Sequence, residues 1–338
     1  MTHTSSIGPQ WPPDQASYGR IKGIFTGGLV ADAEGLEALG HVFEQRLKEL
    51  EPVVRDRISI RAWVSGELVR EPHPVVLRWG EAVIPLDGCG EPWTGTCLVY
   101  FGRNAVSRAC DQGDLERSLE NLVIAETKDA RGASEMVERV RQNGYGLRIL
   151  SREEREGDAD LQHDMAGLYS RFGWSADETK EILANPNSLI AIGEKDGKPV
   201  SAGIAELSWI AFEDGHNLRV AEFTEAATRR EHQGQGLYSG IVATLCRDLA
   251  ARSARQDVLG GELQMAFGEC SGHDLGVLIA AKHLGRTFSR RICLEWGLPL
   301  GGFLPQHVPI AGAPRSTPYN DLFPTFLSRQ ALDAFVAR

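Results

Sequence analysis

The sequence predicts an α+β protein with a smaller N-terminal domain and a larger C-terminal domain. The length of 338 residues exceeds that of most single domains. Strand-like and helix-like hydrophobic patterns alternate along most of the chain, which is typical of mixed architectures. The clearest local pattern is a strand over 218–228, then a loop with Gly234 and Gly236, then an amphipathic helix over 237–251.

The stretch 145–297 has the pattern of one complete domain. Ser175 and Glu178 have the spacing of a capping box, and Asp196-Gly197 favours a tight hairpin turn. The elements expected here are strand 145–151, helices 164–172 and 175–184, hairpin strands 188–194 and 199–212, strand 218–228, helix 237–251, strand 261–269, helix 273–284 and strand 287–296.

The flanking regions are expected to form three further parts. Residues 1–20 are expected to be a disordered lead, and residues 298–338 a Pro-rich tail that packs on the body and ends in a helix over 329–337. Residues 21–144 form the predicted N-terminal α+β domain of unknown role. Its expected elements are helix 33–50, strands 58–64, 75–79, 83–86, 96–101 and 122–125, and helix 133–143 ended by Gly144.

Composition and charge exclude several functional classes. The net charge of −10 argues against an electrostatic grip on nucleic acid or on an anionic membrane surface. No apolar run approaches the ~20 residues that cross a bilayer. The first residues lack the basic region and apolar core of a signal peptide, so a cytoplasmic location is expected. The six cysteines form no Cys-x-x-Cys pair and the nine histidines do not cluster, so neither disulfides nor a metal site is expected.

The loop before helix 237–251 has the features of a phosphate-binding site. The first N–H groups of a helix lack internal partners, and the helix dipole places positive charge there. Gly234 and Gly236 lack a Cβ, so an anion can approach the main chain closely. A Walker loop would need Lys and Ser or Thr after its last glycine, and a dinucleotide fingerprint would need a third glycine. Leu237 and Tyr238 stand there instead.

The segment Gln233-Gly234-Gln235-Gly236-Leu237-Tyr238 resembles the acyl-CoA pyrophosphate loop of the GNAT acetyltransferase superfamily, (Arg/Gln)-x-x-Gly-x-(Gly/Ala). Tyr238 departs from the small final residue of that pattern. The order of elements over 145–297 is similar to one acetyltransferase domain, and the two-part chain is similar in outline to β-lysine acetyltransferases. The resemblance implies a GNAT fold, in which helices flank a mixed central sheet. It also implies acetyl-CoA as co-substrate, bound by 233–238 and by backbone groups near Ala226 and Thr228. The N-terminal domain has no second phosphate loop and is compatible with a degenerate copy of the fold.

Acetyl transfer to an amine needs a base, because an amine with a pKa of ~10.4 is almost wholly protonated at neutral pH. The resemblance implies a glutamate on strand 218–228, where Glu222 and Glu225 are the candidates. Regular alternation would put these two on opposite faces. A β-bulge, which acetyltransferases often have in this strand, would change that alternation.

The acid that protonates the departing thiolate is usually a tyrosine on the last helix in this superfamily. Ala281 occupies that place. Tyr238, His273 and Cys270 are the alternatives, and the thiolate can also leave without an acid.

We therefore expect an acyl-CoA-dependent N-acyltransferase that transfers acetyl to the amine of a small molecule, such as an amino acid or related metabolite. A donor with a longer acyl group and a non-catalytic acyl-CoA-binding module are the alternatives. The expected partners are the amine and acetyl-CoA, without metal, nucleic acid or membrane, and a homodimer stays open. Glu126, Glu206, Glu213 and Asp214 are candidates to hold a cationic amine.

Overall fold

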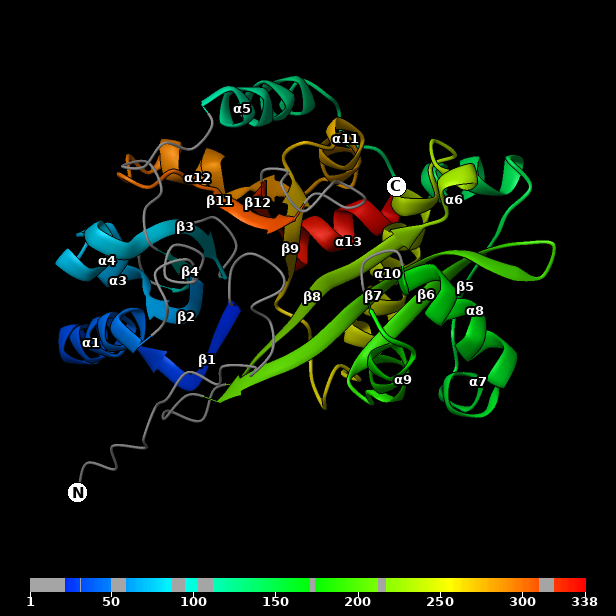
Figure 1. The fold of residues 1–338 in the computed structure, drawn as a ribbon, viewed down its shortest axis with the longest axis horizontal. Helices are drawn as coiled ribbons and strands as arrows, with labels where there is room; N and C mark the ends of the chain where they lie inside the picture. The colour runs from blue at the N-terminus through cyan, green and yellow to red at the C-terminus, as the bar shows by residue number, and fades with distance from the viewer. Residues whose placement is uncertain are drawn as a thin grey trace.

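The part of the chain that the structure describes forms two sheets, one of four strands and one of eight. The computed structural model describes residues 22–30, 32–49, 59–86, 95–102, 112–170, 174–211, 217–309 and 319–338. In Figure 1 the N-terminal elements (blue to cyan) lie to the left of the larger sheet. The lead expected over 1–20 lies outside the described residues.

The four-stranded sheet has the order β1-β2-β4-β3, with β1 parallel to β2 and the other pairs antiparallel. All six residues of β3 are buried, which explains the continuous apolar runs in this part of the sequence. Leu36, Leu39 and Phe43 of α1 belong to its core. The elements are β1 Lys22–Val30, α1 Ala33–Glu49, β2 Ser59–Ser65, α3 Gly66–Arg70, α4 Pro74–Trp79, β3 Gly80–Pro85 and β4 Thr96–Gly102.

The eight-stranded sheet consists of two antiparallel halves joined by one parallel pair. Strands β5 to β8 form one half, and β9, β12, β10 and β11 form the other. Strands β8 and β9 are parallel and connect the halves. The strands are β5 Gly146–Ile149, β6 Ser188–Lys195, β7 Lys198–Ala211, β8 Asn217–Thr228, β9 Met265–Ser271, β10 Thr287–Phe288, β11 Leu304–Pro309 and β12 Tyr319–Ser328.

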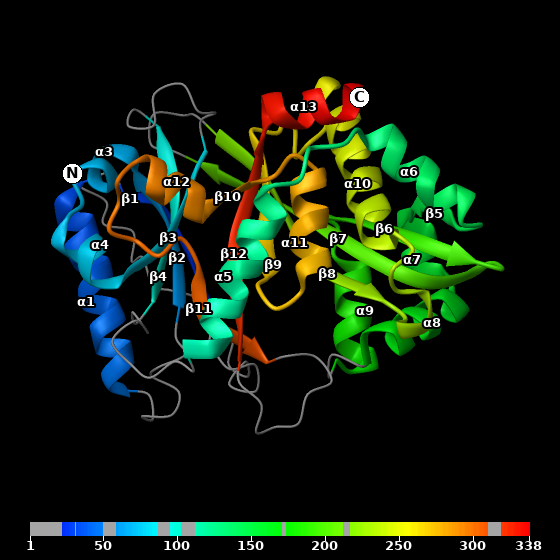
Figure 2. The ribbon, with the colours of Figure 1, turned by 90° about the horizontal axis from the view of Figure 1, so that it is seen from above.

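Helices cover both faces of the larger sheet. The predicted apolar stripe of α10, which includes Ile241, Leu245 and Leu249, is buried against one face, and α8 and α9 cover Ile190 and Ile204 on the other. Figure 2 shows α5 alongside α11, with which it shares an apolar cluster. The helices are α5 Gln112–Glu126, α6 Ala133–Gln142, α7 Arg152–Gly157, α8 Ala159–Tyr169, α9 Ala176–Ala184, the 3₁₀ turn η4 Arg230–His232, α10 Leu237–Ala254, α11 Leu275–His283, α12 Ser289–Glu295 and α13 Arg329–Ala337.

The two sheets share one hydrophobic core. Met265 and Phe267 of β9 pack in the same cluster as Trp63 of β2, and the rings of Trp63 and Phe267 meet edge to face with centroids 6.4 Å apart. A polar contact adds to this. Ser289 Oγ of α12 accepts from Val83 N at 2.9 Å and donates to Val83 O at 2.7 Å.

Three strand predictions were wrong, because short apolar runs do not distinguish a strand from a buried helix. The strand expected over 75–79 is helix α4, which begins at Pro74. The strand expected over 122–125 lies in α5, where Ser118, Leu122 and Ala125 are buried at helical spacing. The strand expected over 287–296 ends after β10 and continues as α12.

Residues 298–338 do more than cover the body. They supply β11 and β12, and β12 lies between β9 and β10 in the larger sheet. Seven successive residues of β12 pair with β9, from Leu322 opposite Ser271 to Ser328 opposite Met265. The helix expected over 329–337 is α13. Pro324 is tolerated inside β12. The pairing of β12 with β9 joins segments far apart in the sequence, so a local pattern does not predict it.

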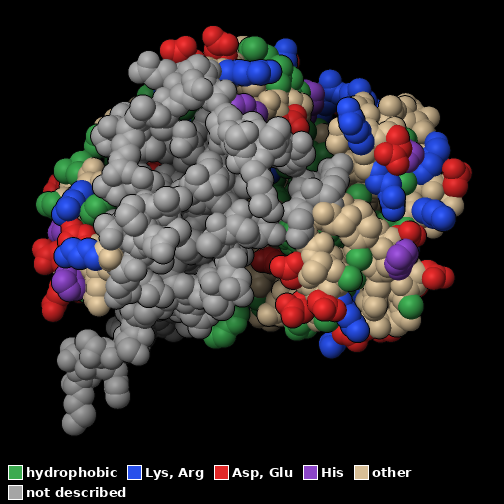
Figure 3. Space-filling model, viewed as in Figure 1, with side chains coloured by type: hydrophobic (Ala, Val, Ile, Leu, Met, Phe, Trp, Pro, Cys, Tyr) green, Lys and Arg blue, Asp and Glu red, His purple; other side chains and the backbone are tan. Residues whose placement is uncertain are grey.

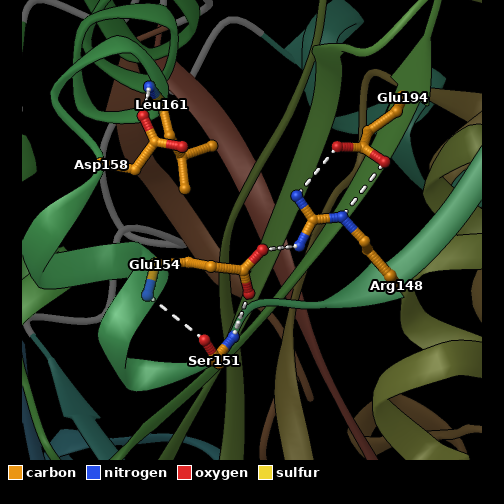
Figure 4. Close-up of polar contacts among 6 residues, drawn as sticks. All are labelled: Arg148, Ser151, Glu154, Asp158, Leu161 and Glu194. Atoms are coloured by element: carbon orange, nitrogen blue, oxygen red, sulfur yellow. Dashed lines mark hydrogen bonds and ion pairs between the residues drawn. The ribbon is translucent and has the colours of Figure 1, made fainter.

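Two capping boxes begin helices on the α8–α9 side. The expected box of Ser175 and Glu178 begins α9. The sequence analysis missed α7, which begins with the same arrangement of Ser151 and Glu154. Figure 4 shows how Arg148 joins this box to β6. Its guanidinium contacts Glu154 at 2.5 Å and Glu194 at 3.0 Å.

Replacing the Ser151 cap should destabilise the protein. Ser151→Ala removes the oxygen that accepts from Glu154 N, and we expect a loss of about 1 kcal/mol in the free energy of unfolding. Ser151→Asp keeps a capping oxygen and should stay within about 0.5 kcal/mol of the wild type. Urea unfolding measures both. A midpoint for Ser151→Ala equal to that of the wild type would show that the cap contributes nothing.

Candidate functional site

The predicted phosphate loop has the backbone conformation that its glycines allow. Gly234 and Gly236 have φ values of 77° and 80°, in the left-handed region that disfavours other residues. A Cβ at Gly236 would meet only Val140 Cγ2, at 3.8 Å, so the constraint here is φ rather than space. Gly236 is the N-cap of α10 and provides no side-chain cap. The first N–H groups of this 18-residue helix therefore point toward the loop without a side-chain acceptor.

Side chains from α6 and β5 hold the loop in place. Asn143 Nδ2 donates to Gln235 O at 3.2 Å. The Tyr145 hydroxyl lies 3.0 Å from His232 Nδ1, and Lys195 Nζ lies 4.7 Å from the Tyr145 ring centroid. Gln233, which is exposed, reaches back to Thr228 O at 3.4 Å.

Positive charge gathers around this loop. Figure 3 shows basic side chains over α6 and the adjoining end of the β6–β7 hairpin. Arg139 and Arg141 lie in the last turn of α6, and Arg229 and Arg230 follow β8 directly. Together with the helix dipole, these cations favour a multiply charged anion at the loop.

The side chains of Leu237 and Tyr238 point away from the loop. Leu237 is buried beside Val140 and Tyr145, and Tyr238 packs against the core around α10. Burial, followed by the influence of Cys270, raises the pKa of the Tyr238 hydroxyl. Only the backbone of these two residues is therefore exposed to a ligand at the start of α10.

Strands β8 and β9 pair over a short length and then stop. The parallel register runs from Val220 opposite Met265 to Phe223 opposite Gly268. Beyond this point β8 continues to Thr228 and β9 to Ser271 without pairing with each other in the described register. We call the opening between 224–228 and 269–271 the wedge. Its vertex is the last pair, Phe223 and Gly268.

A β-bulge lies in β8 beside the wedge. Thr224 pairs with Ile204 and Ala227 with Ala202, so 225 and 226 together oppose Gly203. The extra residue reverses the alternation, and Ala227 packs with Ile204 on the α8–α9 face. The side chain of Glu225 lies outside the described part of the chain, and Ala226 is exposed. The Thr228 hydroxyl lies 2.7 Å from Ser201 Oγ.

Glu222 forms an ion pair with a residue of the small sheet. Arg61 Nη1 of β2 lies 2.6 Å from Glu222 Oε1 and 4.0 Å from Glu269 Oε1. Both ends are largely buried, with 9% of the Arg61 side chain and 17% of the Glu222 side chain exposed. Burial acts to lower the pKa of Arg61, but the carboxylate of Glu222, with Tyr100 and Glu269, raises it overall. Burial and then Glu269 raise the pKa of the nearby Tyr100 hydroxyl.

The surroundings of this pair are acidic. Glu206 of β7 is the register partner of Glu222, so paired strands place both carboxylates on one face. Three carboxylates, from Glu206, Glu222 and Glu269, thus lie on adjacent strands near the Arg61 guanidinium. Of the other candidates to hold an amine, Glu126 is exposed at the end of α5, and Glu213 and Asp214 lie outside the described residues.

The possible general acids lie in different surroundings. Ala281 is buried in the α5–α11 cluster with Leu122. His273 lies in the turn before α11, outside the paired strands that carry Glu206 and Glu222. Cys270 is fully buried, and this burial raises the pKa of its thiol. Tyr238 and Cys270 lie together near Arg286, since each of the three influences the others electrostatically.

The sequence analysis missed two buried arginines. Arg61 interrupts the apolar run of β2, and Arg286 follows the terminal glycine of α11. Both are almost fully buried, at 8% and 2% exposure. A single charge within an apolar strand was the available signal for Arg61, because arginine is rarely buried without a partner.

Two negative observations apply to the described ranges only. No helix there is long and apolar enough to cross a membrane. Nor do three or more His, Cys, Asp and Glu side chains in those ranges come together as metal ligands would. The described cysteines, Cys97, Cys246, Cys270 and Cys293, are buried, and Cys89 and Cys110 lie outside the described residues.

The sequence matches no protein-family model and no curated protein. Solved acetyltransferase structures match the fold over about half of the chain. The ribosomal-protein-S18-alanine N-acetyltransferase from Escherichia coli is 15% identical, with 54% of this chain and 93% of that chain covered and a TM-score of 0.36. An N-acetyltransferase from Staphylococcus aureus is 8% identical, with coverages of 55% and 98% and a TM-score of 0.36. The yncA structure from Salmonella typhimurium, solved with its cofactor acetyl-CoA, is 12% identical, with coverages of 55% and 94% and a TM-score of 0.37.

At these identities and scores the likeness concerns fold outline alone, and the activities of those proteins are not carried over to this chain. The strand order, the wedge and the left-handed loop before α10 are features of this chain itself. Together they give its C-terminal part a mixed sheet flanked by helices, with an opening between two strands beside the loop.

Proposed function

We propose that the chain is an acyl-CoA-dependent N-acyltransferase that acts on the amine of a small molecule, with acetyl-CoA as the donor expected from the sequence. The observation that carries this proposal is the wedge, which opens at the end of β8 that leads into the loop and α10. A phosphate group fits the start of α10. An amide-containing arm fits the edge of β8 that β9 leaves unpaired.

The charge beside the wedge supports an amine acceptor. Glu206, Glu222 and Glu269 place three carboxylates on adjacent strands beside the wedge, and Arg61 pairs with Glu222 there. Carboxylates are suitable ligands for a protonated amine. An amino acid or a related metabolite remains the expected class.

Glu222 is the proposed base. The amine nitrogen forms a bond to the thioester carbonyl carbon, the carbon–sulfur bond breaks, and CoA leaves as the thiolate. Glu222 accepts the first proton, which converts the ammonium to the neutral amine, directly or through water. The nitrogen loses its second proton after the new bond forms, and this proton passes to the thiolate or to solvent. The ion pair with Arg61 holds the Glu222 carboxylate in place at 2.6 Å, so Arg61 acts as a positioning residue. Glu225 stays the alternative base.

A second candidate function is a non-catalytic acyl-CoA-binding module. The observation that favours it is also the Arg61–Glu222 pair, because the guanidinium occupies a carboxylate oxygen that a base would use. Turnover of an acyl-CoA with any amine would reject this candidate.

Thermal stabilisation of the protein by a panel of acyl-CoAs tests the proposal. A ligand that binds only the folded state stabilises it by about 2.7 kcal/mol at a hundredfold excess over Kd. A rise in Tm with CoA thioesters, followed by turnover with small amines, would support the proposal. The absence of any shift would reject it.

Gly236→Val should abolish CoA binding. Valine disfavours the φ of 80° at Gly236, so the N–H groups that begin α10 would move from their positions. Gly260→Val is the matched control, because Gly260 has a φ of 76° and open space around it, near the other end of α10. Calorimetric titration with CoA should show an affinity loss of at least about tenfold for the first variant only. Equal affinities in both would place the phosphate site elsewhere.

Glu222→Gln should lower kcat by about 10²–10³ and remove the fall in rate at low pH that protonation of a base causes. CoA affinity should stay unchanged, since the loop is not altered. Glu206→Gln serves as the control, with an expected effect on the KM of the amine and the same fall in rate at low pH. If the pH profile of Glu222→Gln matches that of the wild type, the base is Glu225 or water.

A further inference from the structure

Arg286 lies at the vertex of the wedge, on the side of the sheet covered by α10. Its Cζ is 5.4 Å from the centroid of the Phe223 ring. Its Nη2 lies 2.8 Å from the position that a Cβ at Gly268 would take. Phe223 and Gly268 are the last residues that pair β8 with β9. The absence of a side chain at Gly268 therefore makes room for the guanidinium at the vertex.

The guanidinium of Arg286 has almost no partners among the described residues. Nε and Nη2 have no hydrogen-bond acceptor. Nη1 reaches the Cys270 thiol at 3.9 Å, and the neutral Tyr238 hydroxyl also lies beside the guanidinium. No ion pair joins Arg286 to a carboxylate in the described part of the chain. Arginine at 2% exposure is normally paired, because burying a cation without a counter-ion is costly.

Comparison with Arg61 shows how unusual this is. Arg61 is buried to a similar degree and contacts two carboxylates, Glu222 and Glu269. The neighbours that influence Arg286 are the Tyr238 hydroxyl and the thiols of Cys246 and Cys270. Burial raises the pKa of both thiols, to about 12 for Cys246, so at neutral pH neither provides a negative charge.

The unused donors have a defined chemical match. Two neighbouring N–H groups of a guanidinium form a fork that fits both oxygens of a carboxylate. An acetyl group carries no charge that could meet this cation. The wedge that would receive the acyl arm closes at Arg286, so the end of an acyl chain is the group that would reach it.

We propose that the acyl donor of this enzyme carries a terminal carboxylate, as in succinyl-CoA, and that Arg286 binds this carboxylate at the vertex of the wedge. This inference rests on the proposed function and replaces, for the same site, the acetyl donor expected from the sequence. Nε and Nη2 of Arg286 donate to the carboxylate oxygens, and the Tyr238 hydroxyl lies close enough to contribute. The acyl chain thus supplies the counter-ion that the fold does not.

Calorimetric titration of the full chain with CoA, butyryl-CoA and succinyl-CoA tests this proposal. Butyryl and succinyl chains have the same length and differ in a methyl or a carboxylate at the end. A charge-assisted, two-pronged contact corresponds to a preference of about tenfold or more for succinyl-CoA. Arg286→Gln should reduce the preference to less than about twofold without changing the Kd of CoA.

Two further variants keep the result interpretable. Arg286→Lys keeps the charge but loses the fork, so its preference should lie between those of wild type and Arg286→Gln. This variant also decides the question if Arg286→Gln does not fold. Arg252→Gln removes an arginine paired with Asp248 on the surface of α10 and should keep the full preference.

The failures of the two proposals are distinguishable. Equal binding of succinyl-CoA and butyryl-CoA by the wild type, or a preference that persists in Arg286→Gln, overturns the role of Arg286 and leaves the acyltransferase proposal standing. Binding of CoA alone as tight as that of succinyl-CoA, lost in Arg286→Gln, would assign the guanidinium to the CoA arm and also overturn it. No binding of any CoA compound overturns both proposals.

Discussion

The end of pairing between β8 and β9 is the constraint on which the candidate site depends. A parallel pair can continue only while both edges stay straight and close enough for hydrogen bonds. Here the bulge at 225–226 bends β8, and the Arg286 guanidinium lies over Gly268 where the pairing ends. The strands therefore diverge inside a sheet that is otherwise continuous, and an unpaired stretch of β8 leads directly into the loop of α10.

The small sheet belongs to the site as well as to the scaffold. Its strand β2 supplies Arg61, which reaches Glu222 on β8, and Trp63 of the same strand packs against Phe267 of β9. The shared core and the Ser289–Val83 contacts hold the two sheets in a fixed relation. The division expected at 144 and 297 therefore describes the order of the chain better than the packing. Strand β12 lies beyond the second boundary and completes the larger sheet, and α12, just before that boundary, completes the core of the smaller sheet.

Two buried guanidinium groups flank the last residues that pair β8 and β9, one on each face of the larger sheet. Arg61 contacts Glu222 and Glu269 on the side of the small sheet, and Glu206 is the register partner of Glu222. Arg286 lies among an aromatic ring and neutral thiols on the side of α10, without a carboxylate partner in the described residues. The proposed acceptor cation would meet the carboxylates of one face, and the proposed donor anion would meet the guanidinium of the other. The opposite signs follow from the alternation of β9, since Glu269 and Cys270 are consecutive residues that point to opposite faces.

The sequence by itself determined the local elements whose signals are contained within one segment. The stripe of α10, the capping box of α9, the Asp196-Gly197 turn and the left-handed glycines of the loop were predictable, because each depends on residues a few positions apart. The possibility of a bulge near Glu225 came from the family resemblance. Only the tertiary structure decided the rest. The insertion of β12 between β9 and β10, the pairing of Arg61 with Glu222 across 161 positions of sequence, and the placement of Arg286 over Gly268 join distant segments. Their energies come from packing and charge pairing in the folded chain, and no local pattern of residues encodes them.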